Sequence, residues 1–270
     1  MTALPRRDPA LPEAPPLLEV DGVTLQYKTK QHLVTATYRV GFKVYRGDRF
    51  ILLGPSGCGK STLLKGVGGF LKPVEGTIRL NGTAVQRPGP DRMMVFQEFD
   101  QLLPWKTVQE NVVFALTASG RLAGKAAVDK ARDAIERVKL AKFAGSFPHT
   151  LSGGMKQRVA IARGMAMEPD ILLMDEPFAA LDAMTRETMN IELQRIWAQY
   201  HKTVLFVTHG IPEAVFLSDR VVVMTARPGR VAAVIDIPFP RPRSAELLGG
   251  AEFAAVAAKI RGVFDTSASR

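Results

Sequence analysis

Apolar runs separated by polar and glycine-rich segments divide this chain into predicted strands and helices. Short continuous apolar runs are typical of strands buried on both faces, and they occur at 50–53, 93–96, 171–174, 204–207 and 221–224. Three further short strands are predicted near the N-terminus, at 18–25, 41–44 and 76–80. Apolar positions with helical spacing predict helices at 61–67, 108–116, 126–138, 156–167 and 253–264. This alternation indicates an α/β fold whose core sheet is mostly parallel and flanked by helices.

Composition indicates a globular protein and narrows its expected location. The 270 residues suffice for one large α/β domain or two small ones, and 46% of them are hydrophobic. No uninterrupted apolar run reaches the roughly 18 residues that a membrane helix needs, and the N-terminus lacks an apolar signal segment. We therefore expect a cytoplasmic protein.

The net charge of +10 leaves three interpretations open: nucleic acid, an anionic membrane surface, or a basic surface that only contacts solvent. The basic residues are spread along the chain and are not grouped in one block with interleaved aromatic residues. A dedicated nucleic-acid-binding surface is therefore not expected.

The distribution of proline predicts where the folded part begins. Residues 1–16 carry five of the 18 prolines and no periodic apolar pattern, which predicts a mobile tail. No internal repeat or long linker divides the rest of the chain. We predict one catalytic domain over residues 17–240, with a helical subdomain at about 98–165. Residues 241–270 are predicted to form a C-terminal extension with a helix.

The segment GPSGCGKST, residues 54–62, fits the phosphate-loop pattern G-x-x-x-x-G-K-[ST]. Its glycines allow backbone N–H groups to turn toward phosphate oxygens, Lys60 supplies positive charge for the outer phosphates, and the Ser61 hydroxyl can bind magnesium. A strand before it and a helix after it would place the phosphates at a helix N-terminus. A glycine-rich turn without a ligand is the alternative. The predicted nucleotide-binding residues here are Gly54, Pro55, Ser56, Gly57, Cys58, Gly59, Lys60, Ser61 and Thr62.

Cys58 is the only cysteine, so an intramolecular disulfide is impossible and a reducing compartment is indicated. Two roles are open for it: a small side chain that fills the loop, or a thiol made reactive by Lys60 and the helix start. In the second case, alkylation would block nucleotide binding and bound ATP would protect the thiol.

Polar residues end several of the predicted core strands. Asp175 and Glu176 follow one strand, Gln97 follows a second and His209 a third. Because ligands bind at the carboxyl ends of parallel strands, these residues should converge on the phosphate loop. A buried Asp at such a point holds magnesium through water, an adjacent Glu polarises the attacking water, and His209 would stabilise that water or the γ-phosphate. Each has a structural alternative: a helix N-cap for the acidic pair, a packed core residue for the histidine.

A second candidate phosphate site lies in the middle of the chain. Ser152, Gly153 and Gly154 precede a long predicted helix. They offer a hydroxyl, free backbone N–H groups and the positive end of a helix dipole. The alternative is a loop that only precedes a helix.

From residue 17 onward the chain resembles the ATP-binding subunit of an ATP-binding cassette (ABC) transporter. LSGGMKQ at 151–157 is similar to the family's signature motif, ILLMDEP at 171–177 to its acidic strand, and ALD at 180–182 to its D-loop. Gln97 and His209 match its Q-loop and switch histidine, and Tyr27 lies where an aromatic ring stacks on adenine. The resemblance implies a P-loop NTPase fold with an ABC-type cassette, in which an N-terminal antiparallel β subdomain and a helical subdomain accompany the core sheet.

The resemblance also implies ATP and Mg²⁺ as cofactors and a homodimer in the ATP-bound state. Lys60, Glu176 and His209 would be catalytic. The magnesium residues would be Ser61, Gln97 and Asp175. Two copies would enclose two ATP molecules head to tail, so that the signature segment of one copy closes over the nucleotide of the other. The residues implied for this contact are Ser152, Gly153, Gly154 and Gln157, with Asp182 in the D-loop.

Transport is the expected use of this ATPase. The chain has neither the long coiled-coil insertion of DNA-repair relatives nor the second cassette of translation-linked relatives. The segment LLPW at 102–105 predicts exposed Leu102, Leu103 and Trp105 as a contact for a separate membrane permease. The alternative is packing of this segment on its own subdomain. With the signature and acidic motifs, LLPW resembles importers of nitrate, sulfonates, taurine and related compounds.

We therefore expect the magnesium-dependent ATPase of a bacterial importer, peripheral at the cytoplasmic face of the inner membrane. Its partners would be integral membrane permease subunits and, indirectly, a periplasmic or lipid-anchored solute-binding protein. Two other classes compete: a non-transport ABC ATPase acting on nucleic acid or the ribosome, and a nucleotide-dependent interaction protein without turnover. Nucleic acid is not an expected partner.

Overall fold

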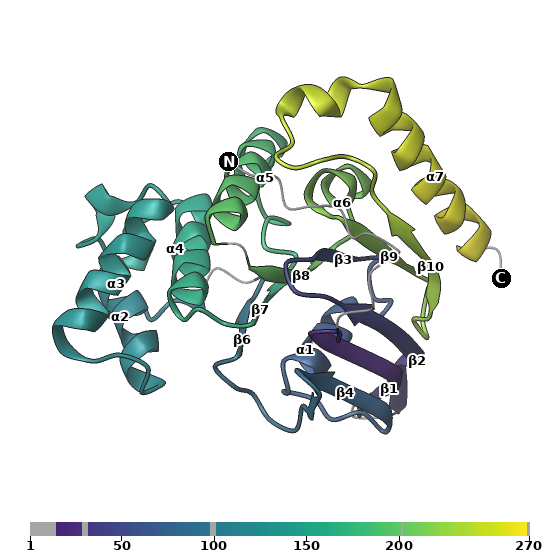
Figure 1. Cartoon of the computed structure of the whole chain (residues 1–270), viewed down its shortest axis with the longest axis horizontal. Coiled ribbons are helices and arrows are strands. Elements are labelled where there is room, and N and C mark those ends of the chain that lie inside the picture. The colour runs from purple at the N-terminus through teal and green to yellow at the C-terminus, as the bar shows by residue number, and fades with distance from the viewer. Residues whose placement is uncertain (1–14, 29–31, 98–100, 201, 269–270) are drawn as a thin grey trace. The chain divides into compact units, whose positions relative to one another are not determined.

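A computed structural model describes residues 15–28, 32–97, 101–200 and 202–268 of the protein (Figure 1). Residues 1–14 of the predicted mobile tail lie outside these ranges. The chain divides into two compact units, residues 1–88 with 203–270, and residues 89–202. Both units combine strands with helices, which agrees with the predicted α/β class.

The first unit contains a four-stranded sheet with the order β2-β1-β4-β5. Its strands are β1 (Leu18–Lys28), β2 (Leu33–Val44), β4 (Glu75–Leu80) and β5 (Thr83–Ala84). Apolar residues alternate along β1, so Leu18 and Val20 are both buried on one face. At the start of β4, Gly76 has a φ of 78°, and a Cβ there would lie 2.3 Å from the carbonyl oxygen of Asp21. All described pairings of this sheet are antiparallel, as the family resemblance implies.

The first unit also contains parallel strands that carry the predicted phosphate loop. They and an antiparallel neighbour are β3 (Arg49–Leu53), β8 (Thr203–Thr208), β9 (Arg220–Met224) and β10 (Val231–Asp236). β3 pairs in parallel with both β8 and β9, and all its residues are buried, as expected for a parallel strand covered on both faces. Leu53 pairs with Thr208, so the residues that follow these two strands emerge at the same edge.

Three helices accompany these strands in the first unit: α1 (Lys60–Val67), α6 (Ile211–Leu217) and α7 (Ala251–Ala268). Helix α7 packs against α6, β9 and β10 (Figure 1). It lies in the segment in which the sequence predicts a C-terminal helix.

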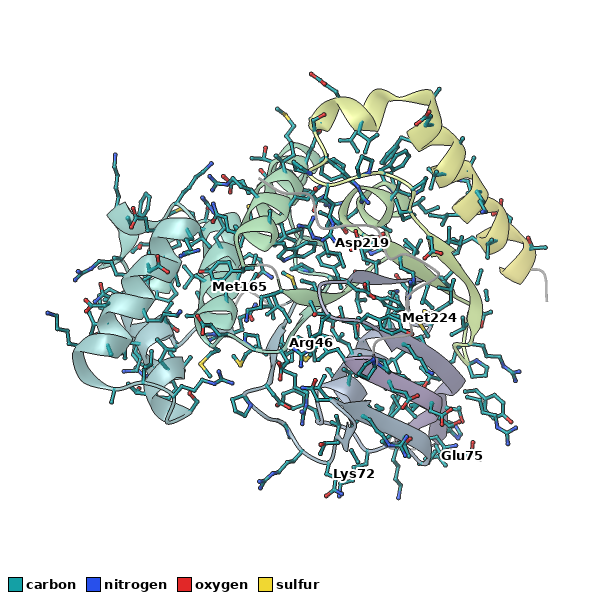
Figure 2. The ribbon with its side chains drawn as sticks, in the orientation of Figure 1. Arg46, Lys72, Glu75, Met165, Asp219 and Met224 are labelled. Atoms are coloured by element: carbon teal, nitrogen blue, oxygen red, sulfur yellow. The ribbon has the colours of Figure 1, made fainter. Side chains whose placement is uncertain are left out.

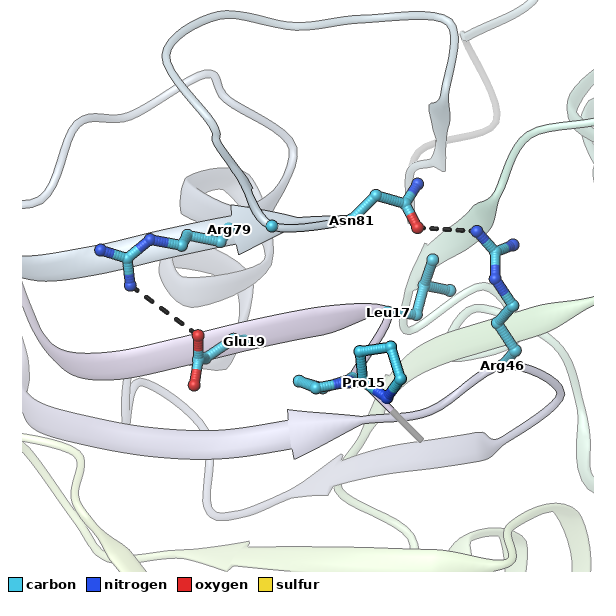
Figure 3. Close-up of a pocket in the computed structure, with 8 residues that line it drawn as sticks. Pro15, Leu17, Glu19, Arg46, Arg79 and Asn81 are labelled. Carbon is cyan, nitrogen blue, oxygen red and sulfur yellow. Dashed lines mark hydrogen bonds and ion pairs between the residues drawn. The ribbon is translucent and has the colours of Figure 1, made fainter. Parts of the chain in front are cut away.

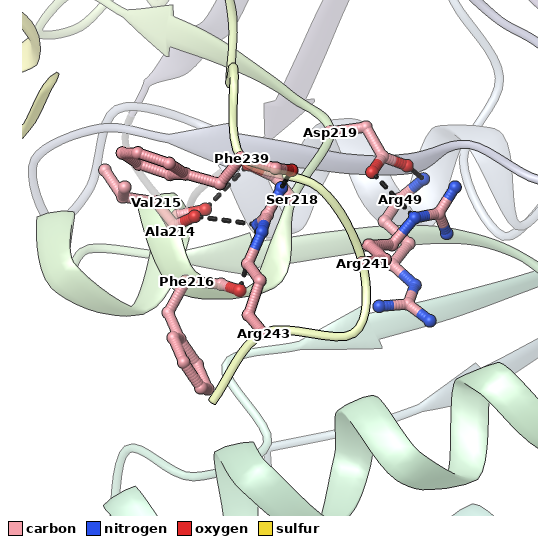
Figure 4. Close-up of polar contacts among 9 residues, drawn as sticks. All are labelled: Arg49, Ala214, Val215, Phe216, Ser218, Asp219, Phe239, Arg241 and Arg243. Carbon is pink, nitrogen blue, oxygen red and sulfur yellow. Dashed lines mark hydrogen bonds and ion pairs between the residues drawn. The ribbon is translucent and has the colours of Figure 1, made fainter. Parts of the chain in front are cut away.

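Arg243 fastens the segment between β10 and α7 to the end of α6 (Figure 4). Its side chain is 7% exposed and donates hydrogen bonds of 2.9 Å to the carbonyl oxygens of Val215, Phe216 and Phe239. The last carbonyls of a helix have no partner within the helix, so a guanidinium at this point satisfies them. Burial lowers the pKa of Arg243 to about 10, which leaves it charged at neutral pH.

A neighbouring aspartate fixes the start of β3. Asp219 accepts a hydrogen bond from the backbone N–H of Arg49 at 2.9 Å, and its other oxygen lies 3.1 Å from Nε of Arg241 (Figure 4). Arg241 and Arg243 thus connect the C-terminal segment to α6 and, through Asp219, to β3. Burial, with a further contribution from Arg241, lowers the pKa of Arg49 to about 9.

The second unit contains a parallel strand pair and a group of helices. Its elements are β6 (Arg92–Val95), β7 (Ile171–Asp175), α2 (Val108–Ala118), α3 (Gly124–Arg137), α4 (Gly153–Ala166) and α5 (Ala183–Tyr200). Helix α2 begins with a capping box, in which Thr107 and Glu110 each accept a hydrogen bond from the other's backbone N–H. Helices α2, α3 and α4 pack on one another, and Met165 of α4 is fully buried (Figure 2). Short 3₁₀ helices occupy Ala141–Phe143 and Pro148–Thr150, and a third, in the first unit, occupies Ala245–Gly249.

The predicted boundaries and the two compact units divide the chain differently. The helical subdomain predicted at about 98–165 contains α2, α3 and most of α4, but the second unit also includes β6, β7 and α5. Strand β10, which is half-exposed and pairs antiparallel with β9, was not predicted from the sequence. The predicted strand at 41–44 is the end of the longer β2.

Candidate functional site

The predicted phosphate loop connects β3 to α1 in the first unit and is tightly packed at its base. A Cβ on Gly54 would lie 2.7 Å from Sγ of Cys58 and 3.2 Å from Cβ of Met224, the last residue of β9 (Figure 2). Cys58 is 1% exposed. Of the two roles left open for it, the buried position favours that of a small residue filling the loop.

Two glycines of the loop have backbone conformations that other residues rarely adopt. Gly57 has a φ of 76° and Gly59 a φ of 100°. Gly59 is also the N-cap of α1, and no side chain caps this helix. The N-terminal N–H groups of α1 are therefore not engaged by a capping side chain, as a helix N-terminus that receives an anion requires. Ser61 and Thr62 follow in the first turn and are partly exposed.

Lys60 is folded back onto its own loop. The side chain is 4% exposed, and Nζ donates hydrogen bonds to the carbonyl oxygens of Gly54 (2.8 Å) and Pro55 (3.0 Å). Pro55, Ser56 and Gly57 form the exposed rim of the loop. The loop therefore holds a positive charge beneath an exposed rim, which suits an anionic ligand.

Two other segments, β2 and the turn at Gly229, closely contact the loop. A Cβ on Gly59 would lie 2.6 Å from the carbonyl oxygen of Ala36 in β2, and one on Gly229 would lie 2.1 Å from that of Cys58. Nε of Arg227 donates a hydrogen bond of 3.1 Å to the carbonyl oxygen of Gly57. Arg227 was not predicted from the sequence, because an Arg-Pro-Gly turn far along the chain gives no local sign of this contact.

His209 lies beside the phosphate loop along the strand edge. It follows β8, whose last residue Thr208 pairs with Leu53, the residue before the loop. Thr208 Oγ1 donates to Glu213 and accepts from the N–H of Gly210, so both ends of this short turn are fixed. His209 itself is exposed. The predicted adenine platform, Tyr27, is a partly exposed residue of β1 in the same unit.

The acidic pair ends β7 in the second unit. Asp175 is 6% exposed, whereas Glu176 is partly exposed and has a φ of 41°. A non-glycine residue with positive φ is uncommon and costs conformational energy, so such residues cluster at functional sites. Met174 pairs with Val95, which places Gln97 at the same strand edge as Glu176.

A cluster of polar side chains holds the segment before Gln97. Gln101 donates to the carbonyl oxygen of Phe96 (2.8 Å) and accepts from its N–H (3.1 Å). Gln157, which is fully buried, donates to the same carbonyl at 3.3 Å. Arg163 donates to the backbone oxygen of Gln101 at 2.7 Å. Gln157 and Arg163 of α4 thus anchor the Q-loop segment. The spacing of residues in the sequence did not indicate the structural roles of Gln101 and Arg163.

The predicted signature residues begin helix α4. Ser152 is its exposed N-cap and accepts a hydrogen bond from Met155 N–H at 3.4 Å, with Gly153 and Gly154 as the first helical residues. Asp182 of the D-loop is exposed and accepts from the N–H of Thr185 at 2.9 Å, at the start of α5. Hydrogen bonds from Thr185 hold the pKa of Asp182 below its ordinary value.

The LLPW segment is only partly exposed. Trp105 has 70% of its surface exposed and Leu103 is partly buried. Leu102 is 3% exposed, so the expectation that it is exposed was wrong. Exposed apolar side chains in the same unit include Phe114, Phe143 and Phe147.

A pocket of about 360 Å³ in the first unit is separate from these residues in sequence and lining (Figure 3). Glu19 and Arg79 form an ion pair of 3.8 Å at its wall, and Arg46 donates to Asn81 at 2.7 Å. None of its lining residues is a predicted site residue.

The structure therefore brings the predicted residues together in two groups. The first unit gathers the phosphate loop and His209 at the carboxyl ends of β3 and β8, and the second gathers Gln97, Asp175 and Glu176 at the carboxyl ends of β6 and β7. Among the described residues, no three His, Cys, Asp or Glu side chains form a metal cluster. No described helix has the length and apolar character of a membrane span.

Residues 38–179 match the family described as ABC transporter. The chain is 48% identical over 226 residues to the taurine import ATP-binding protein of Rhizobium johnstonii, covering 83% of this chain and 86% of that protein. It is 43% identical over 251 residues to the bicarbonate transport ATP-binding protein of Synechococcus elongatus, covering 91% and 90%.

A solved structure with a similar fold points to the same family. A dimeric ATP-binding cassette in a post-hydrolysis state bound to ADP and Pi superposes with a TM-score of 0.70 at 30% identity, covering 82% of this chain and 99% of that one. The P-loop NTPase fold with an ABC-type cassette, predicted from the motifs, is confirmed by this likeness. The chain belongs to the ABC transporter family.

Proposed function

We propose that this protein is the ATP-hydrolysing subunit of an ABC importer. The observation that carries the proposal is the phosphate loop, in which Lys60 and an uncapped helix N-terminus lie together at the end of β3. The relatives named for import and transport agree with the importer function and not with its alternative, an ATPase acting on nucleic acid or the ribosome.

The phosphate loop is proposed to bind the phosphates of ATP. Its N–H groups and those of the first turn of α1 would donate to phosphate oxygens, and Lys60 would leave the loop carbonyls for the outer phosphates. The donor groups fit: two loop glycines have positive φ, and the rim is exposed. Tyr27 is proposed to stack on adenine.

Mg²⁺, when bound with ATP, would neutralise charge that develops on the transferred phosphoryl group. The hydroxyl of Ser61, the amide oxygen of Gln97 and the carboxylate of Asp175 are oxygen ligands of the type that magnesium prefers. Glu176 is proposed to accept a proton from the attacking water, and His209 to contact the γ-phosphate. The unusual backbone of Glu176 and the fixed turn around His209 support these two assignments.

Two copies are proposed to close over two ATP molecules. Ser152, Gly153 and Gly154 form the N-terminus of α4, which suits a phosphate of the other copy's ATP. Gln157 and Asp182 are proposed to support this contact. The likeness to a dimeric cassette bound to ADP and Pi supports an assembly of two copies.

The permease is proposed to dock on the helical subdomain, where Trp105 is exposed. Relatives named as ATP-binding proteins of import and transport systems support a separate membrane subunit. The protein would then work at the cytoplasmic face of the bacterial inner membrane, with a periplasmic or lipid-anchored solute-binding protein on the other side. Nitrate, sulfonates and taurine are the proposed solutes.

The test is uptake by the assembled importer. The chain would be produced with a permease encoded beside its gene and reconstituted in vesicles with the matching binding protein. Labelled taurine and nitrate should enter only with ATP and magnesium on the side of this chain. Hydrolysis stimulated by DNA or ribosomes, with no permease dependence, would overturn the proposal.

A further inference from the structure

The turn after β9, residues 225–230, contacts both β2 and the phosphate loop. Gly229 N–H donates to the carbonyl oxygen of Ala36, and its own carbonyl accepts from Tyr38 N–H, both at 2.9 Å. Thr225 and Arg230 close the turn with a backbone hydrogen bond of 2.9 Å. This turn is therefore fixed to β2 on one side while its other side faces the loop.

The backbone of the turn lies directly against the loop at Gly229. A Cβ at this position would lie 2.1 Å from the carbonyl oxygen of Cys58, a distance that real Cβ contacts do not reach. The Cys58 carbonyl therefore points toward the turn. In a planar trans peptide the next N–H points the opposite way, so the N–H of Gly59 is directed away from the turn.

Arg227 adds a side-chain contact to the same face of the loop. Its Nε donates a hydrogen bond of 3.1 Å to the carbonyl oxygen of Gly57, which is an exposed residue with a φ of 76°. A terminal guanidinium nitrogen also lies 3.4 Å from the position of a Cβ on Gly57. The charged donor thus holds one carbonyl of the loop on the outer face, beside the carbonyl of Cys58.

We propose that Arg227 is a positioning residue for nucleotide binding, which keeps the phosphate loop in the conformation that receives the phosphates. This inference rests on the proposed phosphate-binding role of the loop. Gly57 has no side chain to restrict its backbone, so an external contact is needed to select one conformation before the ligand arrives. Preorganisation of this kind strengthens binding because less conformational freedom is lost when the ligand binds.

Arg230 provides a matched control on the same turn. It is exposed like Arg227 and carries the same charge, but its guanidinium lies over the ring of Tyr38, 4.5 Å from the centroid. Replacement of either arginine removes one positive charge from the same surface. Only replacement of Arg227 removes the contact with the phosphate loop.

The experiment measures binding of MgADP to the full-length chain by titration calorimetry, because ADP reports on the loop without hydrolysis. Arg227→Met should weaken binding about fivefold, the equivalent of about 1 kcal/mol for one exposed hydrogen bond from a charged donor. Arg230→Met should stay within about twofold of the unchanged protein, and Arg227→Lys, which keeps a charged donor, should recover most of the affinity.

Steady-state hydrolysis supplies a second readout. In Arg227→Met the KM for ATP should rise about as much as the ADP affinity falls, while kcat at saturating ATP changes less than about twofold. Equal losses in both arginine variants, unchanged affinity in Arg227→Met, or failure of Arg227→Met to fold would each overturn the proposal. Lys60→Met distinguishes failure of this inference from failure of the proposed function. If this variant binds MgADP normally, the proposed phosphate-binding role of the loop fails, whatever the result for Arg227→Met.

Discussion

The ammonium nitrogen of Lys60 lies 2.8 Å from the carbonyl oxygen of Gly54, at the opposite end of the same loop. A second hydrogen bond joins this ammonium group to the carbonyl oxygen of Pro55. The lysine therefore links the two ends of the loop. In the proposed role, Lys60 would exchange these two neutral acceptors for phosphate oxygens, which form stronger hydrogen bonds with a charged donor.

Lys60→Met should accordingly abolish measurable hydrolysis and weaken MgADP binding at least about tenfold, because one charge-assisted contact is worth about 1.5–3 kcal/mol. Lys65→Met is the control, since Lys65 is an exposed residue of the same helix. It should leave both quantities unchanged. Calorimetry and phosphate release provide the measurements, and normal binding by Lys60→Met would contradict the assignment.

Glu176→Gln should bind ATP and accumulate as a dimer without turnover. The amide has nearly the same shape as the carboxylate but cannot accept a proton from water, so the step after closure stops. Light scattering after gel filtration with MgATP measures the mass, and phosphate release measures turnover. Glu187→Gln, an exposed position on α5, should hydrolyse ATP normally. Repeated turnover by Glu176→Gln would show that another group acts as the base.

Trp105→Ala should leave the ATPase activity of the isolated chain within about twofold but weaken its association with the permease. The ring is 70% exposed, so its removal costs the fold little, whereas a buried Trp at an interface is often worth about 2 kcal/mol or more. Val234→Ala removes an exposed apolar side chain from the other unit and serves as the control. Co-purification with the permease gives the readout, and equal retention of both variants would rule out this docking surface.

Arg243→Met should lower the free energy of unfolding by about 3 kcal/mol, because three buried carbonyl oxygens lose a charged donor. Urea denaturation followed by circular dichroism measures this change. Arg261→Met, on the exposed surface of α7, should change stability by less than about 0.5 kcal/mol. If Arg243→Met lowers the free energy of unfolding no more than Arg261→Met does, water replaces the guanidinium without a loss of stability.

The pair Lys130–Glu168 predicts a dependence of stability on pH. The hydrogen bond from Lys130 holds the pKa of the Glu168 carboxyl below its ordinary value of 4.5. A pKa that is lower in the folded state adds stability above the unfolded pKa, and this is lost as pH falls through the folded pKa. The stability difference between the unchanged protein and Glu168→Gln should therefore be constant at neutral pH and shrink below 4.5.

The matching control repeats this comparison in a Lys130→Met background, where the pH dependence of the difference should be smaller, because Lys202 and Arg121 then act on Glu168 without the hydrogen bond. Urea midpoints at low ionic strength give the measurement, because salt screens an exposed pair of this kind. A difference that persists unchanged at strongly acidic pH would exclude the carboxylate as its origin.

Local signals were sufficient to predict much of the fold. The runs at 50–53 and 171–174 are continuous and apolar, and both correspond to fully buried strands. The half-exposed β10 gave a weaker signal, because its side chains alternate between a partly buried and an exposed face and two of them are alanines. The sequence also could not show that Leu102 is buried while Trp105, three residues later, is exposed, since both belong to one apolar segment.

The candidate site likewise contains some residues that the sequence indicates and others that only the structure reveals. Lys60 and Glu176 belong to contiguous motifs and were found without a structure, although their roles stay predictions. Arg227 and Gln101 act through backbone carbonyls of residues that are remote in sequence or in a loop. Contacts of this kind depend on where the main chain runs and leave no trace in residue spacing.

The hydrogen bonds of Arg243 link the C-terminal segment to the helix that follows the His209 turn. Helix α6 starts directly after the turn that holds His209, and its last carbonyls depend on a residue beyond β10. A protease cut just before that arginine would release the far end of the helix while leaving every nucleotide-binding motif intact. A protein shortened in this way should therefore still bind ATP but hydrolyse it irregularly. Affinity tags are better joined beyond α7 than in place of it.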